Sequence, residues 1–202
     1  EPVLLVAERQ TASRGRLGRP WASDVGASLT SSLGLPLAPA DWSGLSLAVG
    51  VALAESLHTD VRIKWPNDLW LADPAAPMGG RKLGGILIET VPAQGRRMCV
   101  VGVGLNILPQ PLGQFSSGYA SLSELHPEMT ATQALHRLAV PLVRALQTFE
   151  ASGFPAFVGR FAARDILAGR WVTTTMADSP EGRAEGVDDR GALRLICADG
   201  RR

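Results

Sequence analysis

Apolar and polar residues follow two rhythms along this chain, and each rhythm predicts a different kind of element. Continuous or alternating apolar runs bounded by turn-forming residues predict strands; these runs occupy residues 3–7, 27–33, 60–65, 82–90 and 97–108. The first run is apolar throughout, so we expect that strand to be buried. The last two are separated by VPAQGR, a spacing that favours an antiparallel hairpin.

Helical periodicity marks two longer segments. The first follows a cap that Asp41 or Ser43 could supply, and its apolar face consists of Leu45, Val49, Leu53 and Leu57. The second follows a capping box formed by Thr130 and Gln133, and its apolar positions are Leu135, Leu138, Leu142, Leu146 and Phe149. We therefore expect two helices, and the first of them, with its apolar run at 43–54, is expected to be a core helix.

The later part of the chain divides into smaller pieces. We expect Pro141 to kink the second helix, Gly153 to end it, and Pro155 to open a shorter helix toward Gly169. Beyond that point, WVTTTMA and GALRLICA are joined by turns rich in Asp, Gly and Arg, which predicts a small β module. The predicted domains are 1–169 and 170–202. Residues 109–129, rich in Pro, Gly and Ser, predict a long mobile loop with a functional role.

Composition limits the class of protein. With 202 residues, 46% of them apolar and 19% charged, the chain has the composition of a soluble globular protein. The apolar run 43–54 is too short to span a membrane, and no signal peptide is evident. A formal net charge of +1 argues against a general nucleic-acid binder. Cys99 and Cys197 give neither a metal-ligand spacing nor a disulfide framework, which favours a reducing cytosol.

Three stretches could carry chemistry: SRGRLGRPW (13–21), KWPND (64–68) and RKLGGILIE (81–89). Glycines and arginines in the first could cradle an anion, although a solvated turn with surface arginines is the simpler interpretation. In the second, Asn67 and Asp68 could face a ligand or metal, or simply form an Asx turn. Only Lys64 and Lys82 are lysines among the 20 basic residues; Lys64 opens the second stretch, and Lys82 directly precedes LGG in the third.

Paired glycines after Lys82 would let a flat ligand lie against the backbone of a strand. The chain contains no P-loop pattern, and its G-x-G at Gly102 and Gly104 falls within a predicted strand instead of opening a helix. Neither of the common phosphate-binding fingerprints is therefore supported.

Together these stretches resemble the catalytic domain of biotin protein ligases. The matching motifs are Q-x-x-x-R-G-R-x-G-R-x-W from Gln10 to Trp21, GAS at 26–28, KWPNDL, RKLGGILIE and GVGLNI at 102–107. The resemblance covers most of residues 5–108 and continues weakly to the end of the chain. It implies an α+β fold with a mixed or antiparallel central sheet and flanking helices, similar to class II synthetases, followed by an SH3-like C-terminal module.

The resemblance also implies an activity. Such enzymes use ATP and Mg2+ to convert biotin into biotinyl-5′-AMP, and then transfer biotin to a lysine of a biotin carboxyl carrier protein domain of acetyl-CoA carboxylase or a related carboxylase. The Arg/Gly loop would fold over the two substrates. Fixed cations and the exclusion of water suit this chemistry, because two anions must be joined into a reactive mixed anhydride.

Site residues follow from the same resemblance. The implied catalytic residues are Lys82, Arg14, Arg16 and Asp68, the last also a candidate for metal binding or for handling the incoming amine. Implied biotin contacts are Gln10, Ser13, Arg14, Arg16, Trp21, Lys82, Gly84, Gly85 and Ile86. Implied nucleotide contacts are Arg16, Arg19, Trp21, Asn67, Asp68, Lys82, Gly104 and Asn106.

The chain departs from the family pattern in several places. Ser13 replaces the first glycine of the loop, and ADPAAPMGG (72–80) is an insertion. No Ser/Thr-rich biotin-contacting stretch precedes the first strand, and the β module stops early at ADGRR. No winged-helix domain is evident, so we expect no operator DNA binding. A cytoplasmic location is expected, while monomer and homodimer both stay open.

Two other classes of function were weighed. A lipoate or octanoate ligase or transferase of related fold would keep a similar sheet, yet gives no reason for the Arg/Gly loop. A non-catalytic nucleic-acid binder would explain the arginines, but these are not interleaved with stacking aromatic residues. His58, His126 and His136 lack partners at metal-ligand spacing, so we expect surface or helix-face positions for them.

Overall fold

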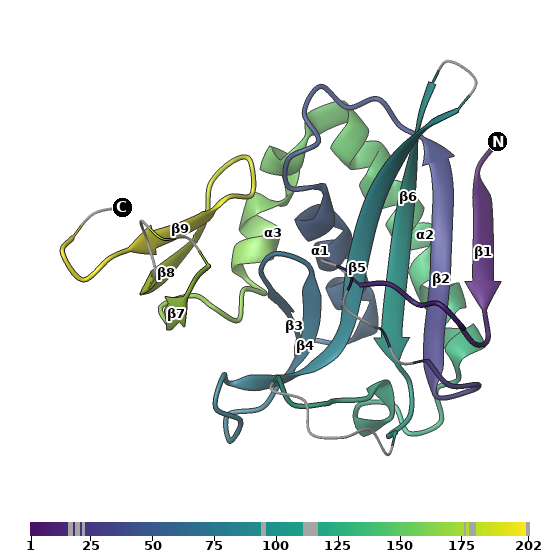
Figure 1. The fold of residues 1–202 in the computed structure, drawn as a ribbon, viewed down its shortest axis with the longest axis horizontal. Coiled ribbons are helices and arrows are strands. Elements are labelled where there is room, and N and C mark those ends of the chain that lie inside the picture. The colour runs from purple at the N-terminus through teal and green to yellow at the C-terminus, as the bar shows by residue number, and fades with distance from the viewer. Residues whose placement is uncertain are drawn as a thin grey trace.

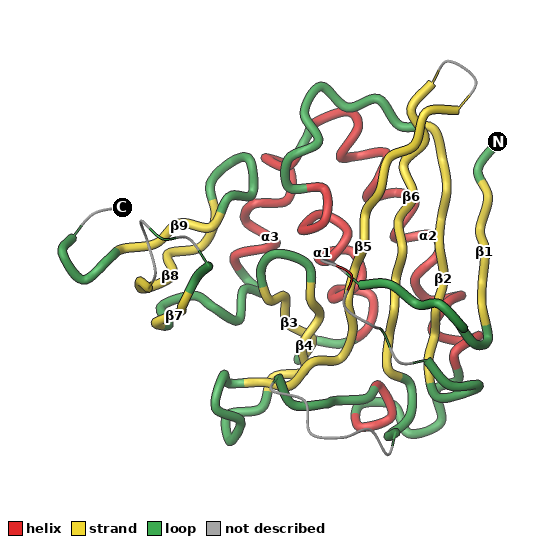
Figure 2. The backbone as a smooth tube through the Cα atoms, viewed as in Figure 1, coloured by secondary structure: helices red, strands yellow, loops and turns green. Residues whose placement is uncertain are grey.

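The computed structural model describes residues 1–15, 18, 21, 23–93, 96–110, 117–175, 177 and 181–200. A large twisted sheet is covered on one face by helices, and a small sheet that ends the chain lies to one side (Figure 1). The segment that follows the first strand crosses the opposite face of the large sheet (Figure 2). None of the described helices combines the length and apolar character that a membrane span requires.

The large sheet has six strands in the order β1-β2-β6-β5-β4-β3, and every neighbouring pair is antiparallel. Their bounds are β1 Val3–Ala7, β2 Ser28–Pro36, β3 Val61–Lys64, β4 Asp68–Ala72, β5 Gly80–Ala93 and β6 Arg96–Asn106. The predicted α+β class and the predicted hairpin, which β5 and β6 form, are confirmed. Gly102 and Gly104 lie inside β6, as expected.

The first predicted strand forms, but the expectation that it is buried is wrong. In β1 the exposed fraction of Leu5 is 65% and that of Val6 is 54%. The strand lies at the edge of the sheet and pairs with β2 alone among the described strands. A continuous apolar run identifies a strand without showing whether other elements cover its faces.

Helix α1 (Leu45–Leu57) is buried over most of its length, because it contacts both the sheet and α2 (Ala131–Ser152). The predicted caps are wrong: Gly44, with φ 78°, precedes the helix and no side chain caps it. Asp41 instead accepts a hydrogen bond from the Ser43 amide (2.9 Å). A Cβ at Gly44 would lie 2.5 Å from Phe154 Cγ, so close packing determines this helix start.

Helix α2 begins as predicted, with Thr130 and Gln133 forming a capping box, and it ends at Gly153. The helix continues through Pro141. Two short helices follow, η3 (Phe154–Phe157), with Pro155 in its first turn, and α3 (Val158–Ala162). Within the region predicted as a loop, η2 (Leu122–Glu124) forms a short 3-10 turn.

Two strands were missed by the sequence analysis. KWPND is not the end of a strand followed by a loop, because Asp68 opens β4 and pairs with Lys64 across a tight hairpin. The C-terminal sheet has the order β7-β8-β9, with β7 Trp171–Thr173, β8 Glu181–Val187 and β9 Leu193–Ile196. Strand β8 lies where the sequence predicts turns, because Gly and Ala dilute its alternation, although Ala184 and Val187 are buried.

Candidate functional site

An open cleft of about 870 Å³ lies against the face of the large sheet that the helices leave uncovered. It brings together residues from all three chemistry-bearing stretches. The predicted site residues that line it are Gln10, Arg14, Trp21, Asn67, Asp68, Lys82, Gly85, Ile86, Gly104 and Asn106. Ser13 and Gly84 lie outside this lining, and Arg16 and Arg19 lie outside the described residues.

The floor of the cleft is a row of residues that crosses five strands. Backbone pairing aligns Thr30 with Gly104, Gly104 with Gly85, Gly85 with Asp68, and Asp68 with Lys64. The two central residues are glycines, so the middle of the floor is bare backbone. Polar side chains stand at both ends of the row, Thr30 in β2 and Lys64 in β3. Thr30 Oγ1 is buried and has no hydrogen-bond partner among the described residues.

A local irregularity in β5 aims Lys82 into this cleft. Lys82 and Gly85 are three positions apart, so a regular strand would place them on opposite faces. The pairing between β4 and β5 shifts register between Leu69 and Trp70, which leaves an extra residue in β5. As a result Lys82 and Gly85 both line the cleft, while Leu83 is fully buried in the core.

Lys82 and Asp68 form an ion pair in the cleft. Lys82 Nζ lies 2.8 Å from Asp68 Oδ1, and the two side chains are 30% and 22% exposed. Gly85 lies beside them, since a Cβ there would be 3.5 Å from Asp68 Oδ1 and 3.8 Å from Lys82 Nζ. A cation and a carboxylate are thus held over a flat backbone surface.

The Arg/Gly stretch crosses over the same floor. A Cβ on Gly104 would lie 2.7 Å from Trp21 Cε2, so the indole ring of Trp21 packs directly on the glycine. Trp21 N donates to Ser13 Oγ (3.2 Å), and this hydroxyl in turn donates to Trp21 O. The serine that replaces the family's glycine therefore joins the two ends of the loop. Gln10 N is anchored in turn by Ser23 Oγ (3.0 Å).

Two predicted nucleotide residues use their side-chain amides to hold the backbone. Asn67 Nδ2 donates to Ile86 O (2.8 Å). The buried Asn106 donates through Nδ2 to Ala120 O (2.9 Å) and to Lys82 O (3.3 Å). Both asparagines line the cleft while fixing the strands that carry its charged residues.

Tyr119 lines the cleft and was missed by the sequence analysis. Its hydroxyl donates to Leu108 O (2.8 Å), and burial, with a further contribution from Glu124, raises its pKa to about 12. The phenol therefore remains protonated at neutral pH and acts as a hydrogen-bond donor. One signal could have found it, because it is the only tyrosine in the chain.

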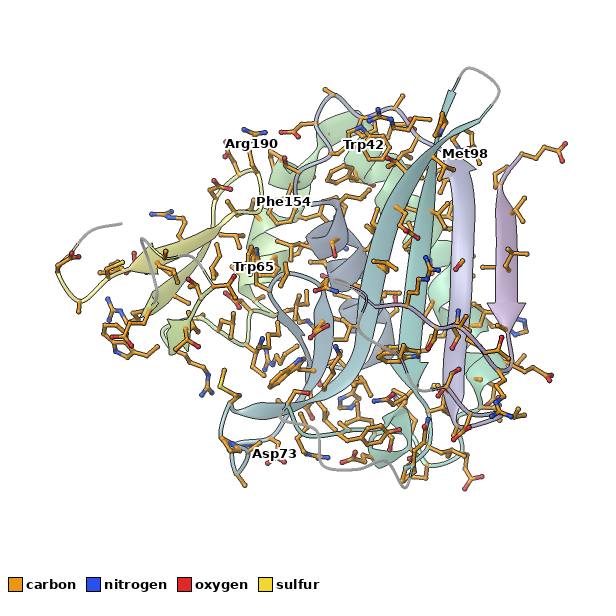
Figure 3. All side chains as sticks on the ribbon, in the orientation of Figure 1. Trp42, Trp65, Asp73, Met98, Phe154 and Arg190 are labelled. Atoms are coloured by element: carbon orange, nitrogen blue, oxygen red, sulfur yellow. The ribbon has the colours of Figure 1, made fainter. Side chains whose placement is uncertain are left out.

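The C-terminal sheet contacts the KWPND hairpin. Trp65 Nε1 donates to Gly191 O (3.0 Å), and Arg190 Nε lies 2.9 Å from Asp41 Oδ2. Figure 3 shows Trp65 lying between the two sheets, and Thr175, just after β7, also lines the cleft. Trp65 is half-buried, packs against the hydrophobic cores on both sides of this junction, and also lines the cleft.

Within the described ranges no group of three or more His, Cys, Asp or Glu residues could hold a metal ion. His58 and His126 do contact each other, edge to face, with ring centroids 5.6 Å apart. Asp68 is the only carboxylate of the predicted site. A Mg2+ ion held by one carboxylate and by substrate phosphates fits this arrangement, since Mg2+ commonly keeps such a mixed shell.

Comparison with known proteins decides the family. The model of the biotin/lipoate A/B protein ligase family matches residues 1–106, and the model of the biotin protein ligase C-terminal domain matches residues 169–202. The chain belongs to the biotin/lipoate A/B protein ligase family. Most of the cleft lining lies within the first of these matches, and Thr175 of the lining and Gly191, which contacts Trp65, lie within the second. Ser117, Gly118 and Tyr119 lie between the two matches.

Individual relatives of this chain are also named as ligases of this family. The bifunctional ligase/repressor BirA of Salmonella typhimurium is 36% identical over 200 residues, covering 94% of this chain and 60% of that protein. The biotin--[acetyl-CoA-carboxylase] ligase of Mycobacterium tuberculosis is 30% identical, covering 96% and 73%. The chain spans about 60% of the length of the BirA relatives.

A solved structure supports the fold. The biotin protein ligase from Aquifex aeolicus in complex with biotin and ATP superposes with a TM-score of 0.80 at 25% identity, covering 98% of this chain and 83% of that chain. The resemblance predicted from the motifs, including the small C-terminal sheet, is therefore confirmed.

Proposed function

We propose that this chain activates biotin with ATP to give biotinyl-5′-AMP and pyrophosphate, and then transfers biotin to a lysine of a biotin carboxyl carrier protein domain. The observation that carries the proposal is the Lys82–Asp68 ion pair over the floor of Gly85 and Gly104. Family membership and relatives named as biotin ligases support it.

Residue roles are part of this proposal. The biotin ring system would lie on the floor near Gly85 and Ile86, below Trp21 and beside Gln10, Ser13 and Gly84. The nucleotide would lie toward Asn67, Gly104 and Asn106, with Arg16 and Arg19 on its phosphates. Arg14, Arg16 and Lys82 would meet where the biotin carboxylate and the α-phosphate join.

The adenylation step needs positive charge where the biotin carboxylate and the α-phosphate of ATP come together. A biotin carboxylate oxygen bonds to the α-phosphorus, the bond from that phosphorus to the bridging oxygen breaks, and pyrophosphate leaves with the electron pair. Both reactants are anionic, so the Lys82 ammonium lowers the barrier by staying close to both throughout. Its compact charge and slender stem suit two successive oxygen partners better than a planar guanidinium does.

The transfer step needs a neutral amine. The carrier lysine attacks the acyl carbon, AMP leaves, and the proton of the amine must be accepted. Asp68 is the carboxylate placed to orient that amine or to accept its proton. Mg2+, bound by Asp68 together with ATP phosphates, would neutralise phosphate charge during the first step.

The proposal also covers the division of the chain into domains and the place of the reaction in the cell. Residues 1–169 would form the catalytic domain and residues 170–202 an SH3-like module that supports it through Gly191. Biotinylation of a carboxylase carrier would take place in the cytoplasm. A lipoate or octanoate ligase or transferase of the same family is the alternative, but the Arg/Gly loop and the names of the relatives favour biotin.

The test is exchange of labelled pyrophosphate into ATP by the purified chain. We expect exchange that depends on biotin and that neither lipoate nor octanoate supports. Lys82→Ala and Arg16→Ala should abolish it, while Arg160→Gln, which disrupts an ion pair with Glu55 away from the cleft, should leave it intact. Exchange driven by lipoate or octanoate alone would overturn the biotin assignment.

A further inference from the structure

A second charged cluster lies one residue away from Lys82, outside the residues assigned above. Arg81 Nε donates to Asp73 Oδ2 (2.8 Å), and its two terminal nitrogens donate to Glu124 at 2.7 and 3.2 Å. One of these nitrogens also donates to Tyr119 O (2.8 Å). A single guanidinium therefore connects the start of the inserted turn, strand β5 and the segment that leads into η2.

The three side chains of this cluster are about one third exposed or less. Hydrogen bonding to Glu124 raises the pKa of Arg81, and hydrogen bonding from Arg81 lowers the pKa of Asp73. Burial works to raise the pKa of Glu124, but hydrogen bonds from Arg81 and the Ser121 amide outweigh it and leave that pKa lowered. All three groups are therefore charged at neutral pH.

The cluster holds one wall of the cleft. Residues 118–120 run alongside β5, with Ala120 N donating to Lys82 O (2.9 Å) and Lys82 N donating to Gly118 O (3.4 Å). Gly118 has φ 64°, and a Cβ there would lie 2.8 Å from Arg81 Cγ, so the stem of Arg81 passes directly over it. Ser117, Gly118 and Tyr119 all line the cleft.

The inserted segment 72–80 supports the cluster from the other side. It folds into a turn closed by Asp73 N donating to Gly79 O (3.0 Å), and Asp73 Oδ1 accepts from the Ala75 amide (3.0 Å). A Cβ on Gly79 would lie 2.1 Å from Arg170 Nη2, so this turn packs against the residue that precedes β7. Figure 3 shows Asp73 at the end of the large sheet, on this inserted turn.

We propose that Arg81 is a positioning residue for ATP: through Asp73 and Glu124 it fixes the wall 117–120 and the backbone of Lys82 where the nucleotide binds. This inference rests on the proposed function, in which Asn106, whose side chain donates to Lys82 O and Ala120 O, borders the nucleotide. Arg81 itself is not among the described residues that line the cleft. Its loss should weaken the use of ATP and leave the biotin contacts at Gly85 and Ile86 unchanged.

The experiment compares Arg81→Gln, Arg81→Lys and Glu124→Gln with the wild type in biotinyl-5′-AMP synthesis. We expect KM for ATP to rise about tenfold or more in Arg81→Gln, and KM for biotin to stay within about twofold. Arg81→Lys should recover part of the loss, because an ammonium keeps the charge but cannot bond both carboxylates and Tyr119 O. Arg160→Gln is the matched control, since Arg160 forms a similar forked pair with Glu55.

Direct binding separates this inference from the proposed function. A wild type that forms no adenylate overturns the proposed function, but Kd for a non-hydrolysable ATP analogue, measured by calorimetry, still tests Arg81. Unchanged ATP binding and unchanged KM in both Arg81→Gln and Glu124→Gln, with only a lower Tm, would show a purely structural role and overturn the inference. Glu124→Gln keeps the side-chain size and serves if Arg81→Gln fails to fold.

Discussion

Strand β5 carries two cations side by side, Arg81 and Lys82, and their surroundings differ. Lys82 faces the cleft and pairs with one carboxylate, Asp68, among the described residues. Arg81 is not among the described residues that line the cleft, and it bonds two carboxylates and a backbone carbonyl. A cation with a single partner can exchange that partner for a substrate oxygen, whereas a cation whose donors are engaged on several segments holds structure. Under the proposed function, Lys82 would therefore take part in the chemistry and Arg81 would support the site.

The largest effect should come from removing the exchangeable cation. Lys82→Ala should slow adenylate formation by about a thousandfold, because fixed charge at the reacting oxygens is lost. Its Tm should change little, since a partly exposed ion pair contributes little to stability. Single-turnover formation of biotinyl-5′-AMP and thermal melting measure the two quantities. If the rate of adenylate formation fell no further in Lys82→Ala than in Arg81→Gln, the two cations could not be assigned different roles.

The partner of Lys82 should matter most in the second step. Asp68→Asn should slow transfer from preformed biotinyl-5′-AMP to a carrier domain by about a hundredfold near neutral pH, because the group that accepts the proton is gone. The deficit should shrink at high pH, where the carrier amine is already neutral. Transfer as fast as wild type at every pH would show that Asp68 is not the base.

A side chain at Gly104, in the glycine floor of the cleft, should disturb both binding and stability. In Gly104→Ala the new Cβ would meet Trp21 at 2.7 Å and displace the indole ring. We expect biotin affinity to fall about tenfold and stability to drop by about 1–3 kcal/mol, as for other overpacked sites. Gly159→Ala, where a Cβ meets nothing within 4 Å, is the control and should retain wild-type affinity. Calorimetry with biotin measures this difference.

The smallest effect should be the pH dependence of the Arg81 cluster. The pKa values of Asp73 and Glu124 are lowered on folding, so their contribution to stability is present above the usual carboxylate range and is lost as pH falls through the lowered values. Glu124→Gln should therefore melt a few degrees below wild type at pH 7, and the gap should narrow steadily as the pH falls below the usual carboxylate range. A gap in Tm that stays constant as the pH falls would contradict this origin.

Much of the fold was predictable because it depends on local patterns. The capping box of Thr130 and Gln133, the buried face of α1 and the β5–β6 hairpin all formed where the periodicity placed them. Strands β4 and β8 were missed, because one begins directly after a tight turn and the other has small residues at inward positions. The exposure of β1 was missed because burial depends on neighbouring elements.

The candidate site was also predictable in part. The types of residue, a lone lysine beside paired glycines and an Arg/Gly loop, were visible in the sequence, and their motifs indicated the family. Their arrangement was not visible, because the row from Thr30 to Lys64 depends on pairing among five strands. The shift that turns Lys82 toward Asp68 is a single extra residue in a strand, which leaves no mark on the pattern.

The sequence by itself determined which chemical groups this protein has and which local elements carry them, because motif chemistry and helix or strand periodicity act over a few residues. Only the tertiary structure decided which cation faces the cleft and which supports it. Arg81 finds Asp73 eight positions away and Glu124 43 positions away. Contacts of that range depend on how strands register and pack, and no short window of sequence encodes them.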